Sequence, residues 1–195
     1  MKSFTSILGR SLLALALAAG SAAAVAGPTY HVDVDTSSQA GNNGGLFLSF
    51  LSYQAGGVGT ATVDHWTGNF AGTGFAVNGA SVDYASRVLT IGSDFDGYLF
   101  DVGFGGHFGF DVTFDIDVDM FGGGFGVALT DSNQDFITGA NVADINFEPG
   151  QPVQVSTNAA YATVEAAAAD VPEPASLALM LGGAGLLGFM RRRRA

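Results

Sequence analysis

The stretch "FDVTFDIDVDM" at residues 110–120 decides the fold. Apolar residues occupy every second position from Phe110 to Met120, and the positions between them hold four aspartates and one threonine. A period of two is typical of a β-strand that buries one face and leaves the other in water. The segment therefore predicts one long inward-facing strand over residues 110–120 of an antiparallel sheet.

Shorter segments of the same kind lie on both sides of this stretch. At residues 30–38, which read "YHVDVDTSS", Tyr30, Val32 and Val34 alternate with polar residues. Many short strands between Gly, Asn and Asp turn signals, with no convincing helical period, predict an all-β fold, an antiparallel β-sandwich that is jelly-roll-like. A closed barrel is the alternative. The remaining candidate strands are 45–53, 58–66, 74–79, 87–92, 97–104, 125–130 and 153–166.

Charge is distributed unevenly along the chain. Lys2 and Arg10 lie near the start, and four arginines lie at the end. Residues 27–171 contain Arg87 as their one basic residue against 17 of the 18 acidic residues, which leaves a net charge of −16. Such a surface repels phosphate backbones, so nucleic acid is excluded as a partner. The chain has no cysteine, which excludes disulfides and thiolate metal ligands.

The first 26 residues have the pattern of a signal peptide. Lys2 and Arg10 supply the positive region, residues 12–19 are apolar, and Ala24 and Ala26 form an A-x-A cleavage site for signal peptidase. An uncleaved anchor helix is the alternative. Whether it is cleaved or stays as an anchor, this signal helix directs the middle of the chain across the inner membrane.

The last 25 residues predict a short transmembrane helix. Pro172 and Pro174 prevent a helix from running through residues 171–174, and residues 175–190 carry no charge. As a helix these residues would span roughly 24 Å, somewhat less than a ~30 Å hydrocarbon core. The positive-inside rule keeps the following cluster in the cytoplasm, so the middle domain faces outward. This cluster consists of Arg191, Arg192, Arg193 and Arg194.

The order of these parts resembles the PEP-CTERM sorting signal. The motif would be Val171, Pro172, Glu173 and Pro174, followed by the apolar run and the arginines. The resemblance implies a Gram-negative bacterium that makes exopolysaccharide, and an exosortase that cleaves near the motif and passes the outer domain to the cell surface or extracellular matrix. A plain membrane anchor is the alternative. The chain then divides into a signal peptide (1–26), an exported domain (27–170) and a sorting signal (171–195).

The mature domain also resembles a recurrent type of PEP-CTERM protein. That type opens with Tyr-x-Val-x-Val-Asp-Thr-Ser, as residues 30–37 do here. This resemblance supplies no catalytic residues.

Two groups of acidic residues are candidates for Ca²⁺. Asp115, Asp117 and Asp119 lie on one face of the predicted strand, but neighbours two residues apart are ~6.5–7 Å apart, so one ion would need a second strand or loop. A solvated acidic face is the alternative. No other cofactor is expected.

The second group lies in "DSNQD", residues 131–135. Asp131, Asn133 and Asp135 have the spacing of the first half of a calcium loop. Phe136 stands where that loop needs Gly and Val142 where it needs Glu, so a hairpin turn is the alternative.

The sequence indicates no enzyme. His31, His65 and His107 lie in three different segments, and a zinc site would form only if distant strands brought them together. There is no G-x-S-x-G elbow that would mark a nucleophile. A hydrolase would need a pocket that joins a histidine to carboxylates from separate strands.

The expected function is therefore that of an exported surface or exopolysaccharide-matrix protein with a structural or adhesive role. The alternative is a carbohydrate-binding module assisted by Ca²⁺. Trp66, Tyr84 and Tyr98 could stack against sugar rings if they are exposed together, whereas their burial would indicate core packing.

Overall fold

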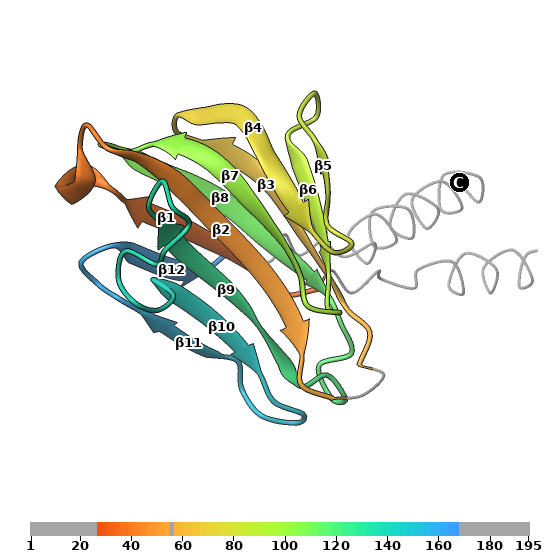
Figure 1. Ribbon diagram of the computed structural model, residues 1–195. Helices are drawn as coiled ribbons and strands as arrows, with labels where there is room; N and C mark the ends of the chain where they lie inside the picture. Colours follow the sequence, from red (N-terminus) through yellow and green to blue (C-terminus); the bar gives the residue numbers. More distant parts are fainter. Residues whose placement is uncertain (1–26, 55–56, 168–195) are drawn as a thin grey trace, which may run out of the picture. The chain divides into compact units, whose positions relative to one another are not determined.

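The computed structural model describes residues 27–54 and 57–167, which build two packed β-sheets (Figure 1). The predicted all-β sandwich is confirmed, and the two separate sheets replace the alternative of one closed barrel. In spatial order, sheet A contains β12 (Ala162–Ala166), β1 (Thr29–Asp35), β8 (His107–Asp115), β3 (Thr60–Thr67), β6 (Val88–Gly92) and β5 (Ser81–Asp83). Sheet B contains β11 (Gln154–Thr157), β10 (Ala143–Phe147), β9 (Gly123–Thr130), β2 (Asn43–Ser52), β7 (Asp96–Gly103) and β4 (Phe70–Val77).

The strands pair in a nested pattern. In sheet A, β1 lies beside β8 and β3 lies beside β6, while in sheet B β2 lies beside β7. All of these pairs are antiparallel, and the chain passes repeatedly from one sheet to the other. This is how a jelly roll winds, and β9 to β12 extend its two sheets at the β2 and β1 edges. A single turn of 3₁₀ helix, Ser37–Gln39, links β1 to β2.

The core between the sheets is dense in phenylalanine. Phe114 of β8 is fully buried, and its ring contacts aromatic rings from both sheets. The ring centroids of Phe147 and Phe50 lie 4.7 Å and 5.5 Å from that of Phe114, and those of Phe125 and Tyr30 lie 5.7 Å and 6.2 Å away. Such edge and tilted contacts add to the stabilisation from burying apolar area, so this cluster holds the two layers together.

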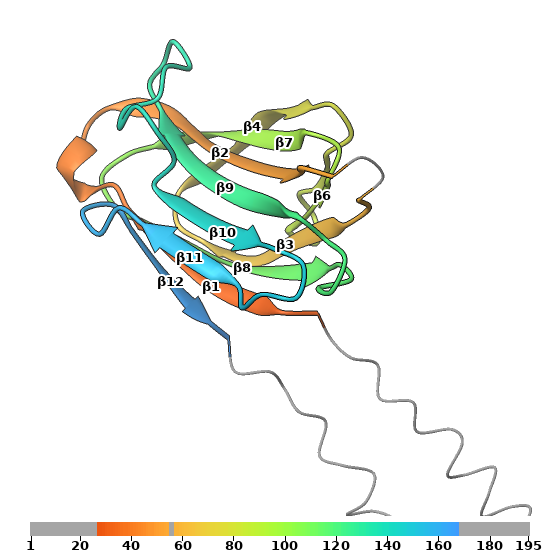
Figure 2. The same ribbon diagram turned by 90° about the horizontal axis from the view of Figure 1, so that it is seen from below.

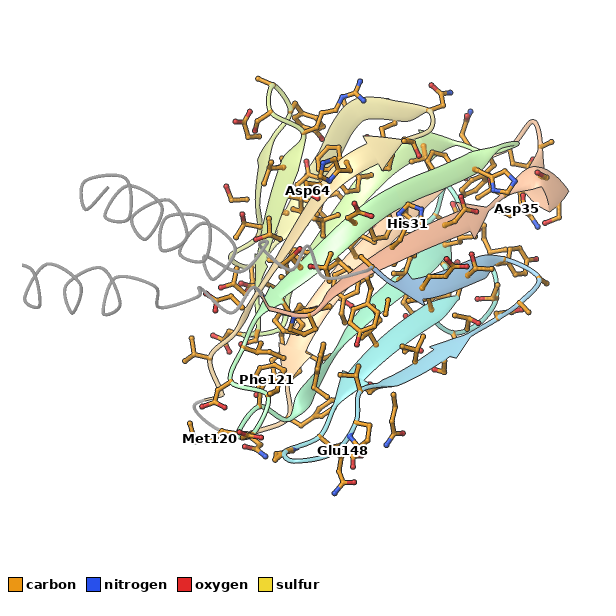
Figure 3. The ribbon with its side chains drawn as sticks, turned by 180° about the vertical axis from the view of Figure 1, so that it is seen from behind. His31, Asp35, Asp64, Met120, Phe121 and Glu148 are labelled. Carbon is orange, nitrogen blue, oxygen red and sulfur yellow. The ribbon has the colours of Figure 1, made fainter. Side chains whose placement is uncertain are left out.

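The prediction of one strand over residues 110–120 is wrong at its end. β8 stops at Asp115, because the neighbouring strand β3 begins at Thr60, directly opposite that residue. The chain then turns: the amides of Met120 and Phe121 both donate to the carbonyl of Asp117. The turn places Phe121 in the core and leaves Met120 66% exposed (Figure 3). The alternating pattern therefore continues past the point where the strand loses its partner.

The segment 153–166 also differs from the expectation of one strand. It forms β11 at the edge of sheet B and β12 at the edge of sheet A, with a turn between them. In that turn the amides of Tyr161 and Ala162 donate to the carbonyl of Asn158. Two strands that were not predicted, β5 and β10, complete the sheets. After residues 131–135, where the sequence allows a hairpin turn, the chain forms one bridge between Thr130 and Phe136.

The described segment begins and finishes at the same end of the sandwich. Tyr30 pairs with Ala166, and the amide of Ala167 donates to the carbonyl of Thr29 over 2.9 Å. Figure 2 shows β1 and β12 side by side at this edge. The predicted signal helix and C-terminal transmembrane helix lie outside the described residues. Within the part of the chain that the structure describes, no helix is both long and apolar enough to cross a membrane.

Candidate functional site

The outer face of sheet A carries a row of acidic and imidazole side chains. In the strand register, His31 of β1 lies opposite Glu165 of β12 on one side and opposite Asp111 of β8 on the other. Asp111 in turn lies opposite Asp64 of β3. Residues directly opposite one another point to the same side of a sheet, so these four residues, the His–Asp row, cross four strands. Figure 3 shows His31 and Asp64 on this face.

A β-bulge adds a second imidazole to the row. Asp64 pairs with Asp111 and Thr67 pairs with Gly109, so β3 takes three steps where β8 takes two. The bulge contains His65, whose backbone has a left-handed φ of 52°. Because a bulge interrupts the alternation of side chains, His65 joins Asp64 on the outer side, while Trp66 turns inward and is 5% exposed.

Each imidazole of the row lies within hydrogen-bonding distance of an aspartate. Nδ1 of His31 lies 2.6 Å from Oδ1 of Asp111, and Nδ1 of His65 lies 2.8 Å from Oδ1 of Asp64. The other oxygen of Asp111, Oδ2, lies 3.3 Å from Nδ1 of His65. A carboxylate can only accept, so each imidazole N–H donates, and Asp111 connects two imidazoles from separate strands.

The third histidine lies on the same face but in another pair. Nδ1 of His107 lies 2.7 Å from Oδ1 of Asp33, and its Nε2 lies 3.8 Å from Oδ1 of Asp35. The hydrogen bond to Asp33, reinforced by the charge of that carboxylate, raises the pKa of His107 above its usual value. Hydrogen bonds from Ser37 lower the pKa of Asp35.

The residues predicted for Ca²⁺ lie in two separate places: Asp115 is the last residue of β8, with Asp117 and Asp119 in the turn that follows it, and the other three lie in a turn after β9. Asp117 accepts a hydrogen bond from the amide of Asp119, in the turn after β8. The carboxylate of Asp131 accepts from the amides of Asp135 and Asn133, which lowers its pKa. The first turn precedes β9 and the second follows it, so they lie at opposite ends of that strand. Asp131, Asn133 and Asp135 thus lie in a turn that the Thr130–Phe136 bridge closes, and Ca²⁺ binding at either turn stays a prediction.

The three aromatic residues predicted for glycan stacking are not exposed together. Trp66 and Tyr98 are 5% and 4% exposed, whereas Tyr84 is 38% exposed and its hydroxyl lies 2.8 Å from that of Tyr98. Burial and this hydrogen bond raise the pKa of Tyr84. Trp66 and Tyr84 also border a hollow in the surface. Its lining consists of Trp66, Gly68, Phe70, Gly72, Tyr84 and Arg87.

The sequence interpretation did not anticipate the His–Asp row. His31 and Asp111 each alternate outward in a clear strand, which the sequence does show, but they become neighbours only through the pairing of β1 with β8. The bulge at His65 has no signal of its own, since a histidine between Asp64 and Trp66 fits a regular strand equally well.

Comparison with known proteins identifies the other functional element. Residues 170–194 match the PEP-CTERM protein-sorting motif, which defines the chain as an exported, surface-associated protein. The chain is a PEP-CTERM sorting domain-containing protein and therefore an exosortase substrate. Searches of curated proteins and of solved structures found no match. The motif residues, Val171 to Pro174, the arginine cluster and the cleavage site at Ala24 and Ala26 lie outside the described residues.

Proposed function

We propose that the β-sandwich is a non-catalytic structural or adhesive protein, displayed on the surface of a Gram-negative bacterium or deposited in its exopolysaccharide matrix. The observation that carries the proposal is the match of residues 170–194 to the PEP-CTERM sorting motif. In this proposal the signal peptide is removed by signal peptidase, the inner membrane holds the precursor, and exosortase processes its tail.

The architecture of the sandwich supports such a role. The chain enters at Thr29 and leaves at Ala167, at one end of the domain, so processing of the tail leaves the rest of the sandwich untouched. The loops 36–42, 104–106 and 131–142 lie at the opposite end, because the strands that they connect run between the two ends. A net negative charge also favours solubility outside the cell.

The sorting part of the proposal is tested by replacing both prolines of the motif. In the native bacterium, Pro172→Ala with Pro174→Ala should leave the protein unprocessed in the inner membrane. The matched control is Pro152→Ala, which removes an exposed proline of the sandwich and should mature normally. Normal maturation of the double variant would overturn exosortase processing and leave a plain anchor.

The location is tested by intact-mass spectrometry on separate membrane and matrix fractions. We expect a matrix species that begins near Gly27 and ends near Pro172. A species that keeps Arg191–Arg194 and stays in the membrane would contradict the matrix role.

The second candidate is a carbohydrate-binding module, assisted by Ca²⁺. It is favoured by the hollow beside Tyr84, because an aromatic ring and the cation of Arg87 in one concave surface suit an acidic sugar. Binding of the isolated matrix polysaccharide that is lost in Tyr84→Ala and unchanged in Tyr53→Ala, an exposed tyrosine outside that hollow, would support it. Equal binding by both variants would exclude the hollow.

A further inference from the structure

We infer that Asp64, His65 and Asp111 form a site for a divalent cation of the zinc type on the outer face of sheet A. One ligand atom from each residue lies within 4.8 Å of the others, and within the described ranges this is the one group of three such side chains. The inference does not depend on the proposed matrix role, since the site belongs to the sandwich alone.

The spacing of the atoms suits a small ion. With ligands about 2.1 Å from Zn²⁺, two atoms of a tetrahedral site lie about 3.4 Å apart. The separation of 3.3 Å between Nδ1 of His65 and Oδ2 of Asp111 is close to that value, and the ion would replace the proton that Nδ1 donates in the metal-free protein. The shorter contact between His65 and Asp64, at 2.8 Å, must open by several tenths of an ångström. This is a small movement for side chains of which His65 is 75% and Asp64 36% exposed.

The β-bulge in β3 brings the three ligands together. In a regular strand His65 would point away from Asp64, toward the core. Its left-handed backbone, which is strained for a non-glycine residue, instead turns the imidazole toward Asp111. Such local strain is typical of functional positions, and here it brings a nitrogen ligand to two carboxylates.

The charges around the row favour a bound cation. Asp64 and Asp111 lie directly opposite one another on adjacent strands, and like charges in that position are destabilising. No lysine or second arginine is available within residues 27–171 to offset them, because Arg87 is the one basic residue there. The guanidinium of Arg87 donates to the carbonyl of Trp66, 3.2 Å away. A divalent ion between the two carboxylates would remove this repulsion.

In this site His31 is a positioning residue, which orients a ligand without binding the ion. Its Nδ1–H donates to Oδ1 of Asp111 and thereby leaves Oδ2 turned toward His65. The ring of His31 lies over Gly109, where an added Cβ would be 3.7 Å from Cε1. Hydrogen bonds of this kind orient a ligand, and losing one costs about 10–100-fold in metal affinity.

The ligand types select zinc over calcium. Imidazole suits Zn²⁺, Cu²⁺ and Ni²⁺, whereas Ca²⁺ takes six to eight oxygen ligands. A site with one nitrogen and two carboxylates in an open sheet face offers too few oxygens for Ca²⁺. Positions that the protein leaves open would be filled by water.

The test uses the full chain, purified in detergent without a histidine tag. Zn²⁺ titrated by calorimetry should bind with one ion per chain, and Co²⁺ should give the visible absorption of a tetrahedral site. His65→Asn should lower the Zn²⁺ affinity at least about 100-fold, because losing a ligand should cost at least as much as losing a hydrogen bond that orients one. Asparagine tolerates the left-handed backbone, so this variant keeps the bulge.

The matched control is His107→Asn, which removes an exposed histidine of the same face outside the group of three. It should leave the affinity and the Co²⁺ spectrum unchanged. His31→Gln should weaken binding about 10–100-fold and keep one ion per chain. Equal loss in the His65 and His107 variants, no saturable binding, or displacement of Zn²⁺ by equimolar Ca²⁺ would each overturn the inference. Thermal unfolding of each variant without metal verifies that the sandwich is intact.

Discussion

The outer faces of the two sheets are built from opposite chemistry. The His–Asp row crosses sheet A, whereas a row of apolar side chains crosses sheet B. In the register of sheet B, Phe75 of β4 lies opposite Leu99 of β7, Leu99 opposite Phe47 of β2, and Phe47 opposite Ala128 of β9. Leu99 points away from the core between the sheets and is nevertheless 5% exposed.

Glycines explain how sheet B buries its outer side. A Cβ at Gly97 would lie 2.9 Å from the ring of Phe47, and one at Gly45 would lie 2.6 Å from Cδ1 of Leu99. The large side chains thus occupy the space that side chains at these glycines would need. Sheet B therefore gains stability from both of its faces, while sheet A leaves one face free for polar chemistry.

The largest effect is expected in the core that both sheets share. Phe114→Ala should lower the free energy of unfolding by about 3–5 kcal/mol, because it removes a fully buried ring that contacts four others. Chemical denaturation measures the change. Phe75→Ala, at a position that is 45% exposed, is the control and should cost less than half as much. Equal losses would mean that the core does not extend across both layers as described.

The second prediction compares the outer faces directly. Leu99→Ala should cost about 2–4 kcal/mol, because Leu99 is buried on the outer face of sheet B. Thr90→Ala changes an exposed residue of β6 in sheet A and should cost at most about 1 kcal/mol. The same denaturation experiment decides the matter. If the two losses are alike, the apolar row is not packed and the contrast between the faces fails.

A third variant tests the role of the glycines. Gly97→Ala should cost about 1–3 kcal/mol, since the new methyl group would push against the Phe47 ring and lie 3.0 Å from the carbonyl oxygen of Leu48. Gly106→Ala adds the same methyl group where nothing lies within 4 Å and should be close to neutral. A shift in melting temperature for Gly97→Ala alone would show that sheet B needs the space.

Much of the fold could be predicted from alternation in the sequence. Tyr30, Val32 and Val34 point inward as expected, because a strand with one wet face must alternate. The same rule cannot show where a partner strand begins, so the strand from Phe110 was predicted to run five residues past its actual end at Asp115. Alternation also says little about sheet B, where β9 is buried on both sides.

The candidate site was harder to predict because it depends on pairing between distant strands. Asp111 is 80 residues from His31 in the sequence, and only the register of β1 with β8 joins them. The sorting motif is the opposite case. Its residues, from Val171 to Pro174, act as a local sequence signal, so the sequence alone was enough to identify it.

The smallest expected effect concerns His107, the histidine of sheet A outside the group of three. Two carboxylates of β1, Asp33 and Asp35, face it, while Thr67 of β3, in register with Gly109 on the other side of β8, is uncharged. The hydrogen bond to Asp33 favours the imidazolium in the folded protein and raises its pKa above the unfolded value of about 6.5. The stabilisation is therefore fully present below about pH 6.5 and is lost as the pH rises through the folded pKa.

This pH dependence can be measured by NMR titration of the His107 ring. The midpoint should lie above the ordinary histidine value in the unmodified protein and fall toward it in Asp33→Asn, which keeps the shape of the partner but removes its charge. Asp131→Asn removes a carboxylate from a turn that contains no histidine and should leave the midpoint where it is. An unchanged midpoint in Asp33→Asn would show that the pair does not hold in solution.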